Sequence, residues 1–503
     1  MFKPSALVIA FSALAQLIGF LRTAVIAEAF GTSTTLDAYY LALVLPTFVV
    51  AIVSGLLQVS FVPVYVQMQV SGSSADSVTL RSTIFWLVVA LSTALWTIFA
   101  LSADFFLTKL APGSPSETLA YASGIMPFAA SVLLLNTIAD FVGLLLNSHN
   151  RFALAAAAPA LNALISSAVL LFLASADLTA LVSSLLIGWG GQVMVLVCGL
   201  RPLKLNFPLR HIRLAWGLPL VLRLGAPILP GVVFSTMIIA FLHGRAASLG
   251  PGELSIFGYA WRLYSVPTQV LVLSLSTVLL PHFSRLVAEK KDDEVIRTFS
   301  ALAKTTLLAS SYLLALIYSY GPTYIDILLG RGEFGHTEAT AVSHVLLAFL
   351  CNIFLLSYGT FLSRLLTAHQ KPAILSISSG IALAVVLAVC FPLVESFDVA
   401  GLAFALLLGY ACSTAFLQVI ASRLYAFPFD VFSTAIFLLK ASAALGISIA
   451  AAAASSDVIS FPSASAIFGG VVLTVVYGVL VRVMGLVPAL SPGEPESMRR
   501  ALR

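Results

Sequence analysis

The stretch LSIFGYAWRLYSVPTQVLVLSLSTVLLPHFSRL, residues 254–286, decides the class of fold. It is long and apolar enough to cross a bilayer, because about 20 apolar residues span roughly 30 Å of hydrocarbon as an α-helix. At about 100° per residue, one face of that helix carries a polar stripe of Gly258, Arg262, Ser265, Gln269 and Ser276. The stretch therefore predicts a membrane-length helix with a polar face.

Arg262 is the first functional candidate on this stripe, and Gln269 lies two turns further along. A charge at bilayer depth costs at least about 2.5 to 3.5 kcal/mol on insertion scales, so it should face protein or a water-filled cavity. The alternative is a structural role, in which Arg262 neutralises a neighbouring carboxylate and holds the bundle together.

Composition extends this interpretation to the whole chain of 503 residues, of which 60% are hydrophobic and 9% charged, with a mean hydropathy of +1.05. These proportions indicate an all-α polytopic membrane protein. The four cysteines lie in apolar segments without metal or redox spacing, so neither a disulfide nor a metal site is expected. No cofactor is expected either. The net charge of +5 comes from basic residues in short loops, which set orientation and do not indicate nucleic acid.

Apolar runs predict about fourteen transmembrane helices. A signal peptide is not expected, because the apolar character of the first run continues past the cleavage-like Ala13-Leu14-Ala15 to Ala29. The expected spans are 4–29, 35–62, 81–107, 117–147, 152–174, 177–199, 217–243, 253–282, 298–320, 338–368, 372–393, 397–421, 432–454 and 463–486.

The basic residues predict the orientation of the chain. With the N-terminus inside, the inner loops and tails hold sixteen Lys and Arg residues, and the outer loops hold only Lys109, Arg245 and Arg331. Both termini are therefore expected to be cytoplasmic.

The first two helices repeat the polar-stripe design. Arg22 flanks the stripe of the first helix, and Pro46 lies near the middle of the second. Prolines also predict bends in the fourth helix at Pro127 and in the seventh. The stripe of the first helix comprises Ser5, Ser12, Gln16, Gly19 and Thr23, and that of the second comprises Asp37, Tyr40, Thr47, Ser54 and Gln58.

An internal repeat suggests how the helices are grouped. The sequence LLNSHNR at 145–151 reappears as LLTAHQK at 365–371, and Pro46 and Pro267 are separated by nearly the same offset. Duplication of a six-helix unit would relate the two halves by an axis along the membrane normal, with substrate sites between them. We expect an N-lobe at 1–200, a C-lobe at 201–425, and two further helices with a cytoplasmic tail at 426–503.

Two carboxylates lie within the predicted helices. Asp37 begins the second helix, where it either interacts with that helix's N-terminal dipole or acts as an outer gate residue paired with Arg22. Asp140 lies roughly 10 Å before the inner end of the fourth helix. It either carries protons or a cation, or pairs with a loop arginine.

Several functional classes lack sequence support. The connections between helices are too short for a nucleotide-binding domain, and no Gly-rich phosphate loop occurs. The KKDDE run at 290–294 superficially resembles an acidic metal motif, but a mixed-charge solvated loop explains it better. No catalytic constellation is found, so the protein is expected to be a transporter and not an enzyme.

Several sequence motifs together resemble the MurJ/MviN family of lipid II flippases, in the superfamily that also holds polysaccharide flippases and multidrug antiporters. The motifs extend from about residue 16 to 375. They are GFLRTAVIAEAFG (19–31), LDAYYLALVLP (36–46), FVPVY (61–65), NRFALAAAAPALN (150–162), YAWRLYSVP (259–267), LLPHFSRL (279–286), GRGEFG (330–335) and the turn at 369–372.

The resemblance implies two six-helix lobes forming a V around a central cavity, plus two C-terminal helices, in the bacterial inner membrane. It implies transport of an undecaprenyl-pyrophosphate-linked sugar to the outer leaflet. Carried over by position, Arg22 and Arg262 match cavity arginines that meet the pyrophosphate, and Asp37 matches a functionally important acid. A guanidinium binds phosphate bidentately and stays charged in a low-dielectric cavity.

The sequence departs from the family pattern at several cavity positions. Gln16 stands where an arginine is usual, Thr23 replaces an acid, the basic pair of the second helix falls at about Val50 and Ala51, and a glutamate falls at about Ser54. The carboxylates that form a sodium site in some relatives are also missing from helices seven, eleven and twelve. Either lipid II is bound here with fewer charges, or the cargo is another polyprenyl-linked glycan, such as an exopolysaccharide or O-antigen repeat unit.

We therefore expect a monomeric flippase of a polyprenyl-pyrophosphate-linked glycan, working by alternating access, with possible coupling to the membrane potential, protons or sodium. Gln16 and Gln269 are expected to join Arg22 and Arg262 in binding the substrate, and Asp37 and Asp140 are gate or coupling candidates. The rival hypotheses are a multidrug or cation antiporter, a membrane glycosyltransferase using the 292–294 run, and a scaffold that has lost transport.

Overall fold

The computed structural model describes residues 2–486 except 73, 174–176, 370–372, 426–430 and 457–460. The chain forms two compact units. The first comprises Met1–Gly258 with Arg331–Phe334, and the second comprises Tyr259–Gly330 with Gly335–Arg503. The three-part division of the chain drawn from the repeat stays a prediction.

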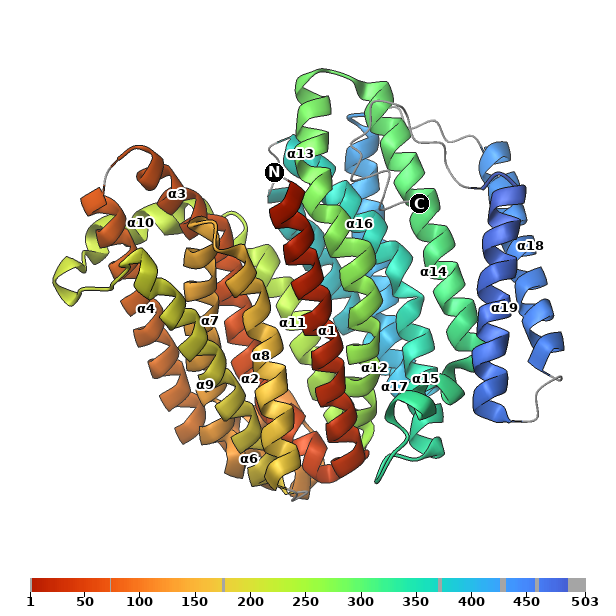
Figure 1. Ribbon diagram of the computed structural model, residues 1–503, viewed down its shortest axis with the longest axis horizontal. Helices are drawn as coiled ribbons and strands as arrows, with labels where there is room; N and C mark the ends of the chain where they lie inside the picture. Colours follow the sequence, from red (N-terminus) through yellow and green to blue (C-terminus); the bar gives the residue numbers. More distant parts are fainter. Residues whose placement is uncertain are drawn as a thin grey trace. The chain divides into compact units, whose positions relative to one another are not determined.

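The first unit is a helical bundle in which α1 lies along α8, and α8 along α9 (Figure 1). It also holds the first turns of α12 (Glu253–Thr268). Its other elements are α1 (Phe2–Phe30), α2 (Thr34–Leu56), the π-helix η1 (Leu57–Phe61), α3 (Val62–Val70), α4 (Ser74–Leu101), α5 (Ala103–Leu110), α6 (Ser116–Ala129), α7 (Ser131–Ser148), α8 (Phe152–Leu173), α9 (Leu178–Leu200), the 3-10 helices η2 (Arg201–Leu203) and η3 (Leu209–His211), α10 (Leu214–Gly225) and α11 (Leu229–Ala247).

The second unit continues α12 and ends in the helix pair α18 and α19, which packs on α14 (Figure 1). A single residue with non-helical angles, Asp398 at φ +50°, divides the 50-residue α17 into two helices. The elements are η4 (Gln269–Leu273, a π-helix), α13 (Ser274–Ala288), α14 (Asp292–Leu329), α15 (His336–Leu350), α16 (Asn352–Ala368), α17 (Ala373–Ser422), α18 (Val431–Ser456) and α19 (Pro462–Val483).

The prediction of an all-α polytopic membrane protein is confirmed. Eleven helices among the described residues are long and apolar enough to cross a membrane. That figure counts α17 once and includes neither α1 nor the continuous α12–η4–α13 segment. It is consistent with the fourteen spans expected from the sequence, and that number itself stays a prediction.

The bend predicted at Pro127 is present, and the backbone group that it frees has a partner. Helix α6 ends at Ala129 and α7 begins at Ser131. The carbonyl oxygen of Pro127 accepts a hydrogen bond from the indole Nε1 of Trp96 at 2.8 Å and another from the Ser131 hydroxyl at 3.2 Å. A backbone carbonyl at membrane depth needs such partners because no water is available there.

Two π-helical turns interrupt helices that periodicity predicted to be regular. Pro63 follows η1 by two residues, and Pro267 precedes η4 by two residues. A proline lacks the N–H that would bond four residues back, and π-turns form where that ladder is broken. The extra residue in η4 shifts the helical phase after Gln269, so the stripe of residues 258–276 does not continue as a regular α-helical face.

The internal repeat has a structural counterpart. Leu145 and Leu146 in α7 and Leu365 and Leu366 in α16 are all fully buried. The histidine after each helix bonds a tyrosine hydroxyl: His149 Nε2 lies 3.2 Å from Tyr65, and His369 Nε2 lies 2.7 Å from Tyr425. Both copies therefore end a core helix in the same way. Residues 370 and 371 of the second copy lie outside the described residues.

A close backbone approach joins the α1–α2 turn to the 331–334 segment within the first unit. The Glu333 N–H donates to the Glu28 carbonyl at 3.0 Å. Gly31 and Gly332 have φ of +53° and +57°, and a Cβ on Gly31 would lie 2.5 Å from the Glu333 oxygen. A Cβ on Gly332 would likewise overlap the Glu28 carbonyl oxygen. Only glycine meets both the angle and the distance.

We expect Gly332→Ala to lower the melting temperature of the protein in detergent. The left-handed angle alone costs an alanine about 1 to 2 kcal/mol, and the overlap with Glu28 adds to that. The control is Gly72→Ala, since Gly72 also has a positive φ, +77°, but open space around it. Equal melting temperatures for the two variants would contradict a role for the close approach.

Candidate functional site

Arg22 carries a positive charge on α1 that no described carboxylate neutralises. Its Nη2 donates to the hydroxyl of Tyr39 on α2 at 2.8 Å, and Tyr39 is 1% exposed. The Nε atom of Arg22 is buried without a hydrogen-bond partner in the described part of the chain. The guanidinium has five N–H donors in a planar fork, so most of its donors remain available for an anion.

Gln16 lies half-buried on α1, one and a half turns before Arg22. Thr23, which stands in place of a family acid, is buried, and its hydroxyl donates to the Gly19 carbonyl at 3.2 Å. That bond satisfies the threonine within its own helix, so Thr23 adds no charge and presents no free donor. The side chains of Ser5, Ser12 and Ser276, also assigned to polar stripes, lie outside those that the structure describes.

Asp37 holds the N-terminus of another helix. Its Oδ2 accepts from the Gly252 N–H at 2.5 Å, and its Oδ1 accepts from the N–H and the hydroxyl of Ser255 at 2.7 and 2.5 Å. The N–H groups of Gly252 and Ser255 lie at the N-terminus of α12, where backbone donors lack partners within their own helix. Asp37 is 1% exposed and forms no ion pair with Arg22. The proposed Arg22 pairing is therefore absent in this conformation, and the dipole that the carboxylate meets belongs to α12.

Asp140 accepts a hydrogen bond from the hydroxyl of Ser54 on α2. Among the residues described, no arginine, lysine or histidine forms an ion pair with it, so pairing with a loop arginine is not seen. Ser54 stands at about the position where the resemblance placed a glutamate. The structure thus places a carboxylate from α7 beside this position of α2.

Arg262 and Gln269 are both half-buried in the second unit. Arg262 lies in the α-helical part of α12, and Gln269 begins η4. The neighbouring Trp261 and Tyr264 pack on Phe349 of α15, with ring centroids 5.4 and 5.3 Å apart. These aromatic contacts fix the turn of α12 that carries Arg262.

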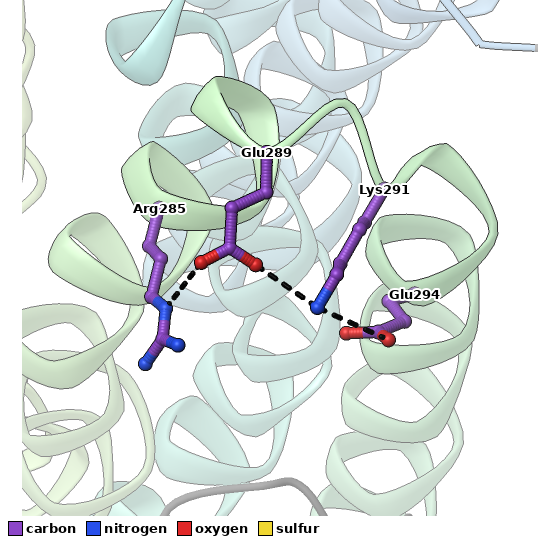
Figure 2. A network of polar contacts seen from close by, with 4 residues as sticks. All are labelled: Arg285, Glu289, Lys291 and Glu294. Atoms are coloured by element: carbon purple, nitrogen blue, oxygen red, sulfur yellow. Dashed lines mark hydrogen bonds and ion pairs between the residues drawn. The ribbon is translucent and has the colours of Figure 1, made fainter.

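The last turn of α13, the loop after it and the first turn of α14 together carry an exposed ion-pair network (Figure 2). Arg285 Nε lies 2.7 Å from Glu289, and Lys291 Nζ lies 2.9 Å from Glu289 and 3.8 Å from Glu294. No group of three His, Cys, Asp or Glu side chains in the described ranges could hold a metal ion. The residues are solvated and of mixed charge, as expected for the 290–294 run, but residues 292–294 form the first turn of α14 and are not part of a loop.

We expect this network to contribute little stability and only above acidic pH. The hydrogen bond from Arg285, and then that from Lys291, lowers the pKa of Glu289 from 4.5 to about 2. Any stabilisation is therefore present above pH 4.5 and lost as the pH falls toward 2. The melting temperature of Glu289→Gln should match the wild type at about 0.15 M salt, where exposed pairs are screened. If the melting temperature of the wild type exceeded that of Glu289→Gln by more at lower pH, the predicted direction of the pH dependence would be wrong.

Sequence reasoning missed the partners of these side chains. Tyr39, Gly252 and Ser255 were not candidates, and neither was the buried amide pair Asn162 and Gln192, whose side chains bond at 2.9 Å. The only available signal was a single amide in each of two apolar helices. Contacts between residues 215 and 218 positions apart, as for Asp37, leave no local pattern.

The helices, their apolar surfaces and the charges within them define a polytopic α-helical membrane protein. The chain belongs to the lipid II flippase MurJ family, whose sequence model matches residues 26–478. The resemblance found in the motifs is thereby confirmed.

Two curated relatives illustrate the similarity. The chain is 26% identical over 347 residues to the probable lipid II flippase MurJ of Rhizobium meliloti, covering 66% of this chain and 64% of the relative. It is 28% identical over 366 residues to the lipid II flippase MurJ of Burkholderia cenocepacia, covering 69% of each. The aligned part thus spans about two thirds of the length of these relatives.

Solved structures show the same fold. A lipid II flippase MurJ in an inward closed conformation matches with a TM-score of 0.80 at 18% identity, over 95% of this chain and 98% of that one. An inward-facing multidrug resistance transporter of the MATE family matches with a TM-score of 0.72 at 13% identity, over 82% and 96%.

Proposed function

We propose that this protein is a flippase that moves a polyprenyl-pyrophosphate-linked glycan, lipid II foremost, from the inner to the outer leaflet by alternating access. Membership of the MurJ family supports the substrate class. The structural observation that carries the proposal is Arg22, a charged group within the apolar helix α1 whose described partner is one phenol and which forms no ion pair with any described carboxylate.

The chemistry of the two arginines suits the pyrophosphate. A guanidinium forms two parallel hydrogen bonds to phosphate oxygens and stays protonated where the dielectric constant is low. Arg22 on α1 and Arg262 on α12 would each contribute such a group, and Gln16 and Gln269 would add neutral donors one to two turns away. The polar headgroup would cross through protein while the polyprenyl tail stays in the lipid.

The direction of transport fits the membrane potential. Each negative charge that moves outward across an inside-negative membrane gains about 2.3 kcal/mol per 100 mV. A pyrophosphate-linked cargo would therefore be driven outward by the potential without ATP. Protons or sodium are further candidate driving ions. We further propose a monomer in the bacterial inner membrane, with both termini cytoplasmic.

The test is rescue of a bacterium depleted of its own essential lipid II flippase. Expression of this chain should restore growth and the appearance of lipid II in the outer leaflet, measured by a probe that reaches only that leaflet. Failure, with the protein verified as folded and present in the membrane, would overturn lipid II as the cargo. It would point instead to an exopolysaccharide or O-antigen repeat unit.

A further inference from the structure

A polar cavity of about 290 Å³ lies in the first unit, between α2, η1, α7, α8 and α9. Its polar wall consists of Ser54, Gln58, Asp140, Asn147 and Gln192. The side chains at its rim, Gln58 and Asn147, are exposed, whereas Gln192 is buried. Asn147 lies near the end of α7, so the cavity extends from a helix end inward to Asp140.

Among the described residues, the carboxylate of Asp140 is the only charged group that lines this cavity. One of its oxygens accepts the Ser54 hydroxyl, and the other has no hydrogen-bond partner in the described part of the chain. A carboxylate in an apolar bundle is costly unless a cation or a proton neutralises it. The structure shows no protein cation that does so within the described ranges.

The wall around Asp140 is held in place. Gln192 accepts from Asn162 at 2.9 Å, and Asn162 in turn accepts from Ser166 at 3.1 Å. Ser54, Gln58 and Asn147 offer neutral oxygens around the carboxylate. A water occupies about 30 Å³ in the liquid, so the cavity has room for an ion with several waters.

We propose that this cavity binds a monovalent cation, sodium or a proton, at Asp140, and that this binding couples the ion gradient to transport. One carboxylate among neutral oxygens balances a single positive charge, whereas tight divalent sites gather several carboxylates. The coupling role rests on the proposed flippase function. The binding itself does not, and it can be measured without any lipid-linked substrate.

The other titratable groups near α7 in the described part of the chain do not line the cavity. His149 just beyond α7 bonds Tyr65 and Gln69. The helices packed on α7 carry further groups at other positions, namely Asp37, Tyr39 and Tyr40 on α2, Tyr65 on α3, Asp76 and Arg81 on α4, Glu117 and Tyr121 on α6, and Cys198 on α9. A variant that lacks only the Asp140 carboxyl leaves all of these groups in place.

The experiment measures the melting temperature of the purified full chain in detergent. Sodium chloride replaces choline chloride at constant ionic strength, and a second series varies the pH in choline chloride alone. The variant is Asp140→Asn, and the matched control is Asp104→Asn, which removes an exposed carboxylate from α5 in the same unit. A ligand that binds the folded state raises its melting temperature.

If the cavity binds sodium, the melting temperatures of the wild type and of Asp104→Asn should rise with the sodium concentration, and that of Asp140→Asn should not. Proton binding predicts no sodium effect, but a difference between the wild type and Asp140→Asn that changes with pH. Responses to sodium and pH in Asp140→Asn that equal those of the wild type would overturn the proposal. If that variant does not fold, Ser54→Ala should shift the sodium or proton midpoint by roughly tenfold, and an unchanged midpoint would overturn it.

Discussion

Alanine at Arg22 is expected to abolish rescue in the depleted bacterium while the protein stays folded, and alanine at Arg262 is expected to do the same. Each charged hydrogen bond lost to a phosphate oxygen costs about 1.5 to 3 kcal/mol, or roughly 10- to 150-fold in binding. A bidentate contact loses two such bonds, and the headgroup then has to cross without its counter-charge. Growth and outer-leaflet lipid II report the loss.

We expect Arg22→Ala to stay folded because of the contacts that Arg22 makes. Removing one member of a buried ion pair strands the other charge and destabilises a protein strongly. Arg22 has no ion pair with any carboxylate in the described residues, and its one bond goes to the neutral Tyr39 hydroxyl. Its removal therefore leaves no stranded charge, and the variant should elute as a single species in detergent.

Three further variants separate charge from geometry. Arg22→Lys keeps the charge without the planar fork and should rescue only in part. Tyr39→Phe keeps the guanidinium and removes only its described partner, so it should rescue. Arg285→Ala removes an arginine in the last turn of α13 whose side chain is 76% exposed, and it should rescue fully. Full rescue by a folded Arg22→Ala variant would contradict a role for Arg22 in binding the pyrophosphate.

The individual helices were predictable, but the contacts of their polar residues were not. Period, length and composition are local, so they identified the helices and the charged residues within apolar runs. Prolines identified the bend at Pro127 and the interruption of the seventh helix, where α10 ends at Gly225 and α11 begins at Leu229. Which group each charge meets depends on how helices pack. Asp140 and Ser54 are 86 positions apart, and neither residue carries a local sign of the other.

The two π-turns show a second limit of prediction from the sequence. A stripe drawn at a constant 100° per residue assumes an unbroken ladder of backbone hydrogen bonds. The backbone hydrogen-bond pattern changes from α-helical to π-helical near Pro63 and Pro267. The added residue rotates the side chains that follow it about the helix axis. Gly258, Arg262 and Ser265 precede the change in α12 and keep their common face, whereas residues after η4 do not follow the same count.

Alanine at Asp37 is expected to destabilise the protein by about 3 to 5 kcal/mol. Hydrogen bonds to a charged acceptor contribute about 1.5 to 3 kcal/mol each, and Asp37 accepts three in a site that is 1% exposed. Its loss leaves the first N–H groups of α12 buried without an acceptor.

A graded series makes this measurable as melting temperature in detergent. Asp37→Asn retains one acceptor oxygen and should fall between alanine and the wild type, and Ser255→Ala removes only the hydroxyl bond and should cost least. The control Asp104→Asn should melt like the wild type. If Asp37→Ala melts with the wild type, the carboxylate does not hold α12. If the melting temperatures follow this order, a transport defect in an Asp37 variant has to be corrected for lost stability before Asp37 is assigned a role as a gate residue. The two roles are linked, because the three bonds that fix the start of α12 to α2 would have to open for the two helices to separate.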